Sequence, residues 1–409
     1  MNAKRRKAHD RLAALPGVRK VRRPLGSVPG EFDLYYVRTG PPSDTPLVIV
    51  PGGPGAASIG GYRNLRRRAV SRGRDVIMVE HRGIGMSRHD DAGADLPTEA
   101  LTIDAAVQDI AAVLDAEQVD TAVIYGTSYG TYLASGFGVR HPERVRAMVL
   151  DSPLLCAADI DAVRAATRAV LWDGGVPGTE RLAATVRRLV TENRLTPWAE
   201  QLAAGLYGLE GPDALQQQLE TLVDGRGLLW NAIGHGTRML FEHKTPYRHE
   251  PDLVEHIGYR ELNYGATPDG LPLDPAVAFR ESAHGEPDFV AEPYDLVARM
   301  PGFDWPTVVI SGGRDLTTPT AVAQRVAGLI PDAHLVVLPT AGHSVLDMRE
   351  RCALEIVTSV YDHKAAELPG RAAELDRNQD ISMQLLVRGI TAATTVESLL
   401  PRIRRSFTA

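Results

Sequence analysis

A serine flanked by glycines is the residue of this chain best suited to nucleophilic chemistry. It lies in the run Gly126-Thr127-Ser128-Tyr129-Gly130, after a short apolar stretch and before a stretch rich in small residues. This order predicts a strand, a sharp turn and a helix, with the serine in a strained backbone conformation that lifts its hydroxyl clear of the sheet. The flanking glycines are expected because the turn leaves no room for Cβ atoms where the strand and the helix approach each other. Ser128 is therefore the candidate nucleophile.

An acid and a histidine farther along the chain complete a catalytic set. Asp315 follows the apolar run 307–312, and His343 follows the apolar run 334–338. The strands of a parallel sheet end at one common edge, so residues distant in sequence can meet there. A serine hydroxyl is a weak nucleophile until an imidazole removes its proton, and the imidazole needs a carboxylate to fix its tautomer. We predict His343 as the general base and Asp315 as its orienting acid, in the chain order serine, acid, histidine that α/β-hydrolases use.

A glycine-rich loop offers donors for the negative charge that acyl transfer generates. Residues 47–50 are typical of a buried strand, and the run Pro-Gly-Gly-Pro-Gly of residues 51–55 follows directly. Backbone N–H groups stabilise a developing oxyanion without having to reorganise. We predict two such donors, the N–H of Tyr129, which follows the nucleophile, and the N–H of Gly53. Gly52 is expected to lie against the substrate.

The segments that must position these residues alternate between strand and helix patterns. Strands are predicted at 32–38, 47–50, 74–80, 145–151, 307–315 and 334–338, and helices at 102–117 and 319–330. Strands separated by segments of helix length indicate βαβ units and a parallel sheet. We therefore predict an α/β fold, of the α/β-hydrolase type, with a mostly parallel sheet and helices on both of its faces.

The strand and helix alternation stops between about residues 154 and 301, where helical patterns such as 179–190 and 213–222 alternate with segments rich in proline and glycine. We interpret this stretch as an insertion over the C-terminal edge of the sheet. The predicted organisation is a first part of the core (1–153), a mainly helical cap (154–301), and a second part of the core with a C-terminal helical extension (302–409). An amphipathic stretch at 381–403 is expected to pack in that extension.

Composition excludes several classes of function. The net charge of −6 argues against nucleic acid as a partner, and the basic cluster of residues 4–7 is typical of a solvated N-terminal segment. His9 and Asp10 interrupt the apolar region that a signal peptide would need, and no run of 18 uncharged apolar residues could span a membrane. Two cysteines in 409 residues are too few for a disulfide framework, which favours a cytoplasmic location. No metal-ligand spacing or dinucleotide fingerprint occurs, so no cofactor is expected.

Several of these motifs together resemble one enzyme family. They are the glycine-rich loop 51–55, the run His81-Arg82-Gly83-Ile84-Gly85-Met86-Ser87, the serine turn 126–130, Asp315 with Thr318-Pro319 behind it, and Gly342-His343. In combination they are similar to the proline iminopeptidase and tripeptidyl aminopeptidase family of α/β-hydrolases, over about 250 residues. The resemblance implies cleavage of an N-terminal residue or short peptide from a substrate with a free amino group.

The chain departs from the family pattern at three places. Pro51 stands where the family commonly has histidine, Glu80-His81 replaces the usual Asp-Gln, and the tail after about residue 369 is long. In the family, a glutamate of the cap binds the amino group of the substrate. The run Arg260-Glu261-Leu262-Asn263-Tyr264 resembles the family's segment, which makes Glu261 the candidate for that role. A structural glutamate is the alternative.

Other functions remain compatible with the motifs. The same triad and oxyanion donors serve an esterase, a thioesterase or a lactonase acting on a small acyl substrate. A ligand-binding protein that retained the hydrolase fold is a further alternative, which slow turnover with tight ligand retention would reveal. Dehalogenase and epoxide hydrolase chemistry needs a carboxylate at position 128 and is excluded by the serine. The substrate is expected to be a small molecule or short peptide, and the oligomeric state is open.

Overall fold

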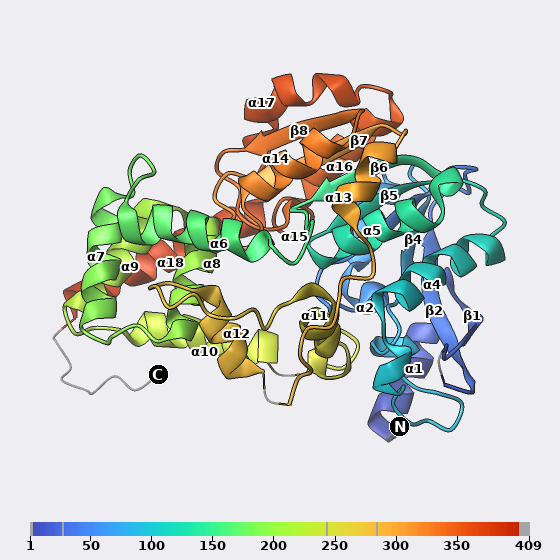
Figure 1. The fold of residues 1–409 in the computed structure, drawn as a ribbon, viewed down its shortest axis with the longest axis horizontal. Helices are drawn as coiled ribbons and strands as arrows, with labels where there is room; N and C mark the ends of the chain where they lie inside the picture. The colour runs from blue at the N-terminus through green and yellow to red at the C-terminus, as the bar shows by residue number, and fades with distance from the viewer. Residues whose placement is uncertain (1–2, 27, 243, 284, 401–409) are drawn as a thin grey trace.

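An eight-stranded sheet runs through the protein (Figure 1). The computed structural model describes residues 3–26, 28–242, 244–283 and 285–400. The strands are, in chain order, β1 (Val18–Pro24), β2 (Glu31–Thr39), β3 (Leu47–Val50), β4 (Val76–Val79), β5 (Ala122–Thr127), β6 (Val145–Asp151), β7 (Thr307–Gly312) and β8 (Ala333–Leu338). Their order across the sheet is β1-β2-β4-β3-β5-β6-β7-β8. The strands from β4 to β8 pair in parallel, whereas β2 is antiparallel to both of its neighbours.

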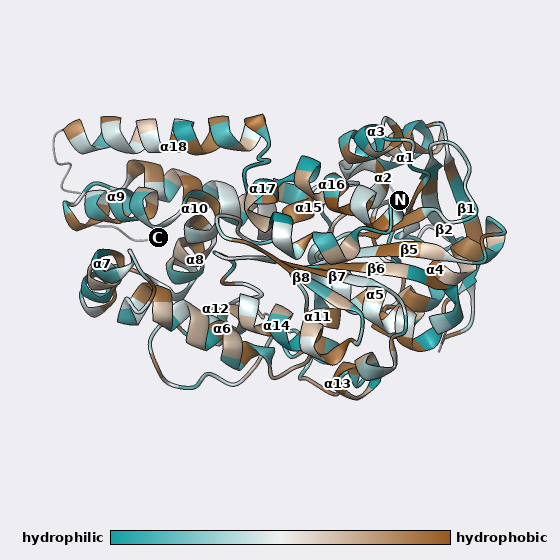
Figure 2. Ribbon diagram, turned by 90° about the horizontal axis from the view of Figure 1, so that it is seen from above, coloured by the Kyte–Doolittle hydropathy of each residue, from teal (hydrophilic) through white to brown (hydrophobic). Residues whose placement is uncertain are grey.

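Helices cover both faces of this sheet (Figure 2). One face packs against α1 (Ala3–Ala13), α2 (Ser58–Gly61), α3 (Arg63–Val70), α15 (Val345–Met348), α16 (Glu350–Tyr361) and α17 (Ala372–Asp376). The opposite face packs against α4 (Ile103–Ala116), α5 (Tyr129–Arg140) and α14 (Thr320–Leu329). The predicted fold class is therefore confirmed.

Two apolar cores explain why the central strands are continuous apolar runs rather than alternating ones. In β3, Val48 and Val50 belong to the core under α4 and α5, whereas Leu47 and Ile49 belong to the core under α3 and α16. All four residues are buried. A parallel sheet covered on both faces has no solvent side, so every position of its strands favours an apolar residue.

A helical insertion separates β6 from β7. It contains α6 (Asp159–Arg168), α7 (Glu180–Thr191), α8 (Pro197–Glu210), α9 (Pro212–Val223), α10 (Leu228–Glu242), α11 (Glu255–Leu262), α12 (Pro275–Ser282) and α13 (Leu296–Arg299). Residues of α7 to α10 form an apolar cluster of their own. Farther along the insertion, Val254, Ile257, Tyr294 and Leu296 pack into the core of the sheet domain. The insertion therefore has one part with its own core and one part that returns onto the sheet.

The C-terminal helix α18 (Ile381–Leu399) packs on the insertion and not on the sheet (Figure 1). The Glu397 carboxylate accepts the N–H groups of Leu228 and Leu229 at 2.6 Å and 3.0 Å, at the first turn of α10. A carboxylate at a helix N-terminus satisfies donors that have no partner within the helix. The extension thus connects the second part of the core to the insertion. Residues 401–403 of the predicted stretch lie outside the described residues.

Short helical turns connect the larger elements. They are η1 (Gly85–Ser87), η2 (Thr98–Ala100), η3 (Pro142–Arg144), η4 (Ala169–Asp173), η5 (Pro251–Leu253), η6 (Met300–Gly302), η7 (Ala365–Glu367) and η8 (Pro369–Arg371). None of the helices in the described part of the chain has the length and hydrophobicity that crossing a membrane requires.

Candidate active site

Ser128 occupies the sharp turn between β5 and α5. Its backbone has φ of 51° and ψ of −125°, an unfavourable conformation for a residue with a side chain. A Cβ on Gly126 would lie 2.3 Å from the carbonyl oxygen of Gly130, and a Cβ on Gly130 would lie 2.1 Å from that of Val50. Neither position can accept a larger residue without moving the backbone. These close approaches are the physical reason for the two glycines around the serine.

The structure brings Ser128, His343 and Asp315 together at the edge of the sheet. The Nε2 atom of His343 lies 2.9 Å from the Oγ atom of Ser128, and its Nδ1 atom lies 2.9 Å from Oδ2 of Asp315. The other carboxylate oxygen of Asp315 accepts the N–H groups of Thr317 and Thr318 at 2.8 Å and 2.9 Å. These bonds fix the carboxylate, which in turn fixes the imidazole with Nε2 facing the serine. This is the arrangement that lets a histidine take a proton from a serine hydroxyl.

The charges of the acid and the histidine are matched to each other. Burial works to raise the pKa of Asp315, but His343 and the hydrogen bonds from Thr318 together bring the pKa below the usual value. Burial works to lower the pKa of His343, but the negative charges around it, that of Asp315 first, together bring the pKa above 6.5. Each group therefore stabilises the charged form of the other. Asp315 stays ionised while His343 gains and loses its proton.

Asp151, at the end of β6, holds the loop that carries His343. Its carboxylate accepts the N–H groups of Val345 and Leu346 at 3.1 Å and 2.7 Å, and the hydroxyl of Tyr125 at 2.9 Å. Burial raises the pKa of Asp151 to about 6. The sequence alone predicts Asp151 only as the end of a strand. A buried acid at the strand end beside the nucleophile was the signal that it also has a positioning role.

The glycine-rich segment of residues 51–57, called here the oxyanion loop, lies directly beside the nucleophile. A Cβ on Gly52 would be 3.1 Å from Cβ and 3.8 Å from Oγ of Ser128. Gly53 has a φ of 137°, a value that residues with side chains rarely adopt. Tyr129 is the first residue of α5, so its N–H has no acceptor within the helix. Both predicted donors, Gly53 and Tyr129, therefore lie on segments next to Ser128.

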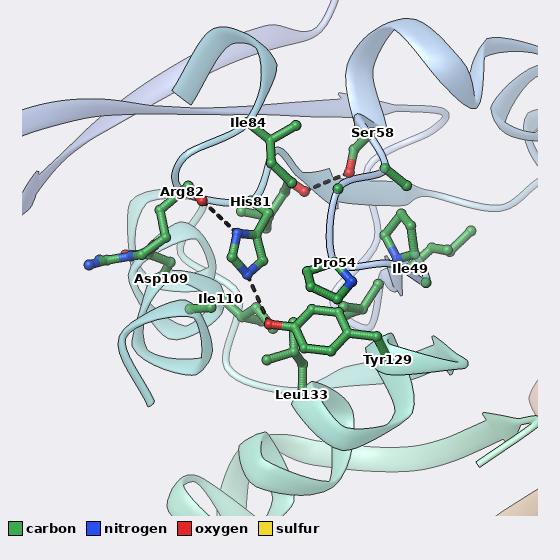
Figure 3. Close-up of a pocket in the computed structure, with 17 residues that line it drawn as sticks. Ile49, Pro54, Ser58, His81, Arg82, Ile84, Asp109, Ile110, Tyr129 and Leu133 are labelled. Carbon is green, nitrogen blue, oxygen red and sulfur yellow. Dashed lines mark hydrogen bonds and ion pairs between the residues drawn. The ribbon is translucent and has the colours of Figure 1, made fainter. Parts of the chain in front are cut away.

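The side chain of Tyr129 lines a small cavity that is also lined by residues of the oxyanion loop (Figure 3). The cavity measures about 30 Å³, which is room for about one or two water molecules. His81 lies across it, with Nε2 3.1 Å from the Tyr129 hydroxyl and Nδ1 2.6 Å from the carbonyl oxygen of Arg82. A carbonyl only accepts, so Nδ1 carries the proton and Nε2 accepts from the tyrosine. Burial lowers the pKa of His81 to about 4, which keeps this tautomer neutral.

Glu261 lies in α11, and its carboxylate already has two partners. One oxygen accepts the N–H of Ile103, the first residue of α4, at 2.9 Å, and the other pairs with Arg260 at 2.5 Å. Burial raises the pKa of Tyr129 well above its usual value, and the negative charge of Glu261 adds to this rise. Glu261 is thus within electrostatic reach of the residue next to the nucleophile. Its role in binding an amino group stays a prediction, alongside the structural role that these contacts show.

Among the described residues, no group of three or more histidine, cysteine, aspartate or glutamate side chains is arranged to hold a metal ion.

Comparison with known proteins places this geometry in a family. Residues 45–235 match the alpha/beta hydrolase fold family, and residues 291–361 match a family described as TAP-like protein. A proline iminopeptidase of Neisseria meningitidis is 30% identical over 325 residues, which cover 77% of this chain and 87% of that protein. The chain belongs to the proline iminopeptidase family of α/β-hydrolases.

A second relative carries a name of the same family, and a solved structure shares the fold. A probable proline iminopeptidase of Leptolyngbya boryana is 23% identical over 323 residues, or 77% of this chain and 86% of that protein. A solved structure from Mycobacterium tuberculosis matches with a TM-score of 0.51 at 19% identity, covering 84% of this chain and 99% of that one. The second match shows the shared fold. The resemblance to the proline iminopeptidase family that the motifs indicated is therefore confirmed.

Replacing the candidate nucleophile provides the first test. Alanine has no hydroxyl from which His343 could remove a proton. Ser128→Ala should therefore keep the fold and lower kcat by roughly 10⁴-fold to 10⁶-fold. Ser135→Ala is the matched control, since Ser135 lies in α5, the helix that follows Ser128, and its hydroxyl has no hydrogen-bond partner among the described residues. An alanine variant at 128 that retained more than about a tenth of the wild-type kcat would contradict the assignment.

The pH dependence of kcat/KM tests the histidine. His343 must be neutral to accept the serine proton, and its pKa lies above 6.5 because of Asp315. Activity should therefore rise with pH along a limb centred above 6.5. A neutral arylester is the substrate of choice, since it does not titrate in this range. A limb centred below 6.5, or a flat profile between pH 5 and 8, would contradict the general-base role.

Proposed function

We propose that this protein is a serine aminopeptidase that releases an N-terminal residue of the proline type, or a short N-terminal peptide. The observation that supports this most directly is the chain of hydrogen bonds from Ser128 through His343 to Asp315, with both links at 2.9 Å. The family to which the chain belongs supplies the substrate class. The relative from Neisseria meningitidis carries the name proline iminopeptidase and is aligned over most of its length.

Acylation follows from the positions of the three side chains. The Ser128 oxygen attacks the carbonyl carbon of the scissile bond as its proton moves to Nε2 of His343. The oxyanion then accepts hydrogen bonds from the N–H groups of Tyr129 and Gly53. His343 gives its proton to the leaving amine, which departs and leaves the acyl group on Ser128.

Deacylation uses the same groups in reverse. A water molecule takes the place of the leaving amine, and His343 removes its proton as the water oxygen attacks the acyl carbon. The collapse of the second oxyanion releases the N-terminal residue as a free acid and returns the proton to Ser128. Asp315 stays ionised throughout and stabilises the imidazolium in both halves of the reaction.

The insertion between β6 and β7 is proposed to act as a cap that selects the substrate. In α8, a Cβ on Gly208 would lie 3.4 Å from Cα of Gly342 and 3.9 Å from the backbone nitrogen of His343, so the insertion touches the catalytic loop. An aminopeptidase must distinguish a chain end from the middle of a chain. A carboxylate that pairs with the substrate ammonium achieves this, because a blocked amine leaves the carboxylate unpaired.

The location proposed for the enzyme rests on its low cysteine content. Cys156 and Cys352 are both free, and burial raises the pKa of the Cys352 thiol to about 12. We propose that the enzyme acts in the cytoplasm, on small molecules or short peptides.

A substrate panel tests the proposal together with the role of Glu261. N-acetylation of a good aminoacyl-arylamide, or Glu261→Gln, should lower kcat/KM by about tenfold or more. Each change removes one of the two charges in the proposed ion pair between the substrate ammonium and Glu261. Glutamine can still accept the N–H of Ile103, so the variant changes the charge and preserves the cap of α4. A neutral arylester is the control, because it has no ammonium group to lose.

The outcomes separate the aminopeptidase from its alternatives. Equal cleavage of acetylated and free-amine substrates would contradict the aminopeptidase and favour an esterase, thioesterase or lactonase. A loss that is the same for arylamide and arylester in the Glu261→Gln variant would assign Glu261 a structural role. Very slow turnover of every substrate with tight retention of one would indicate a binding protein.

A further inference from the structure

Arg5 of the N-terminal helix α1 forms a buried ion pair with Glu250 of the insertion. The Arg5 side chain is 9% exposed and that of Glu250 is 0% exposed. Two contacts join the guanidinium and the carboxylate, Nη1 to Oε1 at 2.5 Å and Nη2 to Oε2 at 2.9 Å. Nη2 also donates to the carbonyl oxygen of Gly85 at 3.0 Å. The prediction that the basic cluster is only a solvated segment is therefore wrong for Arg5.

Contacts with two tyrosine side chains also hold α1 in place. The Arg5 guanidinium carbon lies 4.7 Å from the centre of the Tyr247 ring, and the Tyr247 hydroxyl donates to the Arg5 carbonyl oxygen at 2.8 Å. One turn along the helix, His9 Nε2 lies 3.1 Å from the Tyr35 hydroxyl on β2. Tyr247 belongs to the insertion and Tyr35 to the sheet. Helix α1 therefore connects the two.

The segment that carries Glu250 is paired with the oxyanion loop. The N–H of Glu250 donates to the carbonyl oxygen of Gly55 at 2.9 Å, and the N–H of Ala57 donates to that of Arg248 at 2.9 Å. A Cβ on Gly55 would lie 3.2 Å from Cα of Pro251, so the two backbones are in contact. Any shift of the Glu250 segment would move the loop that contains Gly53.

We propose that Arg5 is a positioning residue for the oxyanion loop, which it holds in place through Glu250. Stabilisation of an oxyanion depends on donors placed within a few tenths of an ångström of their working positions. A displacement of about 1 Å can cost roughly 10²-fold in rate. The inference rests on the proposed acyl transfer at Ser128, but not on whether the natural substrate is an amide or an ester.

The charge of Glu250 explains why Arg5 matters more than an ordinary surface arginine. Glu250 also accepts the N–H of Gly85 at 2.7 Å, and Arg88 lies 3.9 Å from it. A second buried acid, Glu80, is near enough for its negative charge to be repelled by that of Glu250. Burial raises the pKa of Glu80 to about 7, and the charge of Glu250 adds to the rise. Without Arg5 the buried carboxylate of Glu250 would lose its bidentate partner, which is strongly unfavourable.

The test compares Arg5→Met with three other variants on a neutral arylester. Arg5→Met should lower kcat by about tenfold or more, with KM changed by less than about threefold, because a misplaced donor weakens the transition state and not ground-state binding. Arg5→Lys keeps the charge and should retain more of the activity. Arg6→Met removes an exposed cation of the same helix and should be unchanged.

The double variant Arg5→Met/Glu250→Gln covers the case in which Arg5→Met alone does not fold. Glutamine removes the unpaired charge, so the double variant should fold, as a wild-type-like circular dichroism spectrum would show, and should still have a lowered kcat. A wild-type kcat in folded Arg5→Met, or in the folded double variant, would overturn the inference. Failure of the wild-type enzyme to cleave any arylester would instead contradict the proposed function on which the inference rests.

Discussion

The strained backbone of Ser128 is the constraint on which the site depends. A side chain at φ of 51° and ψ of −125° costs of the order of 1–3 kcal/mol and persists only when its surroundings enforce it. The enforcement is visible in the hydrogen bonds on either side. The Ser128 N–H donates to the carbonyl oxygen of Asp151 at 2.9 Å, and the Ser128 carbonyl accepts the hydroxyl of Thr131 at 2.6 Å. The neighbouring strand and the first turn of the helix thus hold the nucleophile above the sheet.

Buried carboxylates organise the loops around this serine in a repeated way. Glu80 after β4 accepts the N–H groups that begin α2, Asp151 at the end of β6 accepts those that begin α15, and Asp315 after β7 accepts those of residues 317 and 318. In each case the acid lies at or after the end of a strand, and it accepts hydrogen bonds from the backbone N–H groups of a nearby loop or helix start. Desolvation opposes the charge, so the pKa of Glu80 is raised to about 7 and that of Asp151 to about 6. The exception is Asp315, whose pKa is lowered because it faces His343. The candidate catalytic acid is thus the member of this set that contacts a histidine.

Local sequence patterns were sufficient to predict that Ser128, His343 and Asp315 lie close together, because each of them follows an apolar strand. The predicted strand 145–151 coincides with β6, and the predicted strand 74–80 contains β4. Contacts that join distant segments could not be predicted in this way. Nothing in the run of residues 4–7 shows that Arg5 pairs with Glu250, since the ion pair depends on how the insertion returns onto the sheet. The contact between His81 and Tyr129 was hidden for the same reason, although the unusual Glu80-His81 pair indicated a local difference.

The formation of an acyl-enzyme on Ser128 is the most direct test of this account. A slowly deacylating arylester should give a burst of released aryl alcohol, and mass spectrometry of the acid-quenched, digested protein should find the acyl group on the peptide that contains Ser128. We expect the amount of acyl group on Ser128 to equal the amount of aryl alcohol released in the burst. Ser128→Ala should show neither the burst nor the acyl group. An acyl group on another side chain, or a burst of unchanged size in the alanine variant, would contradict this account.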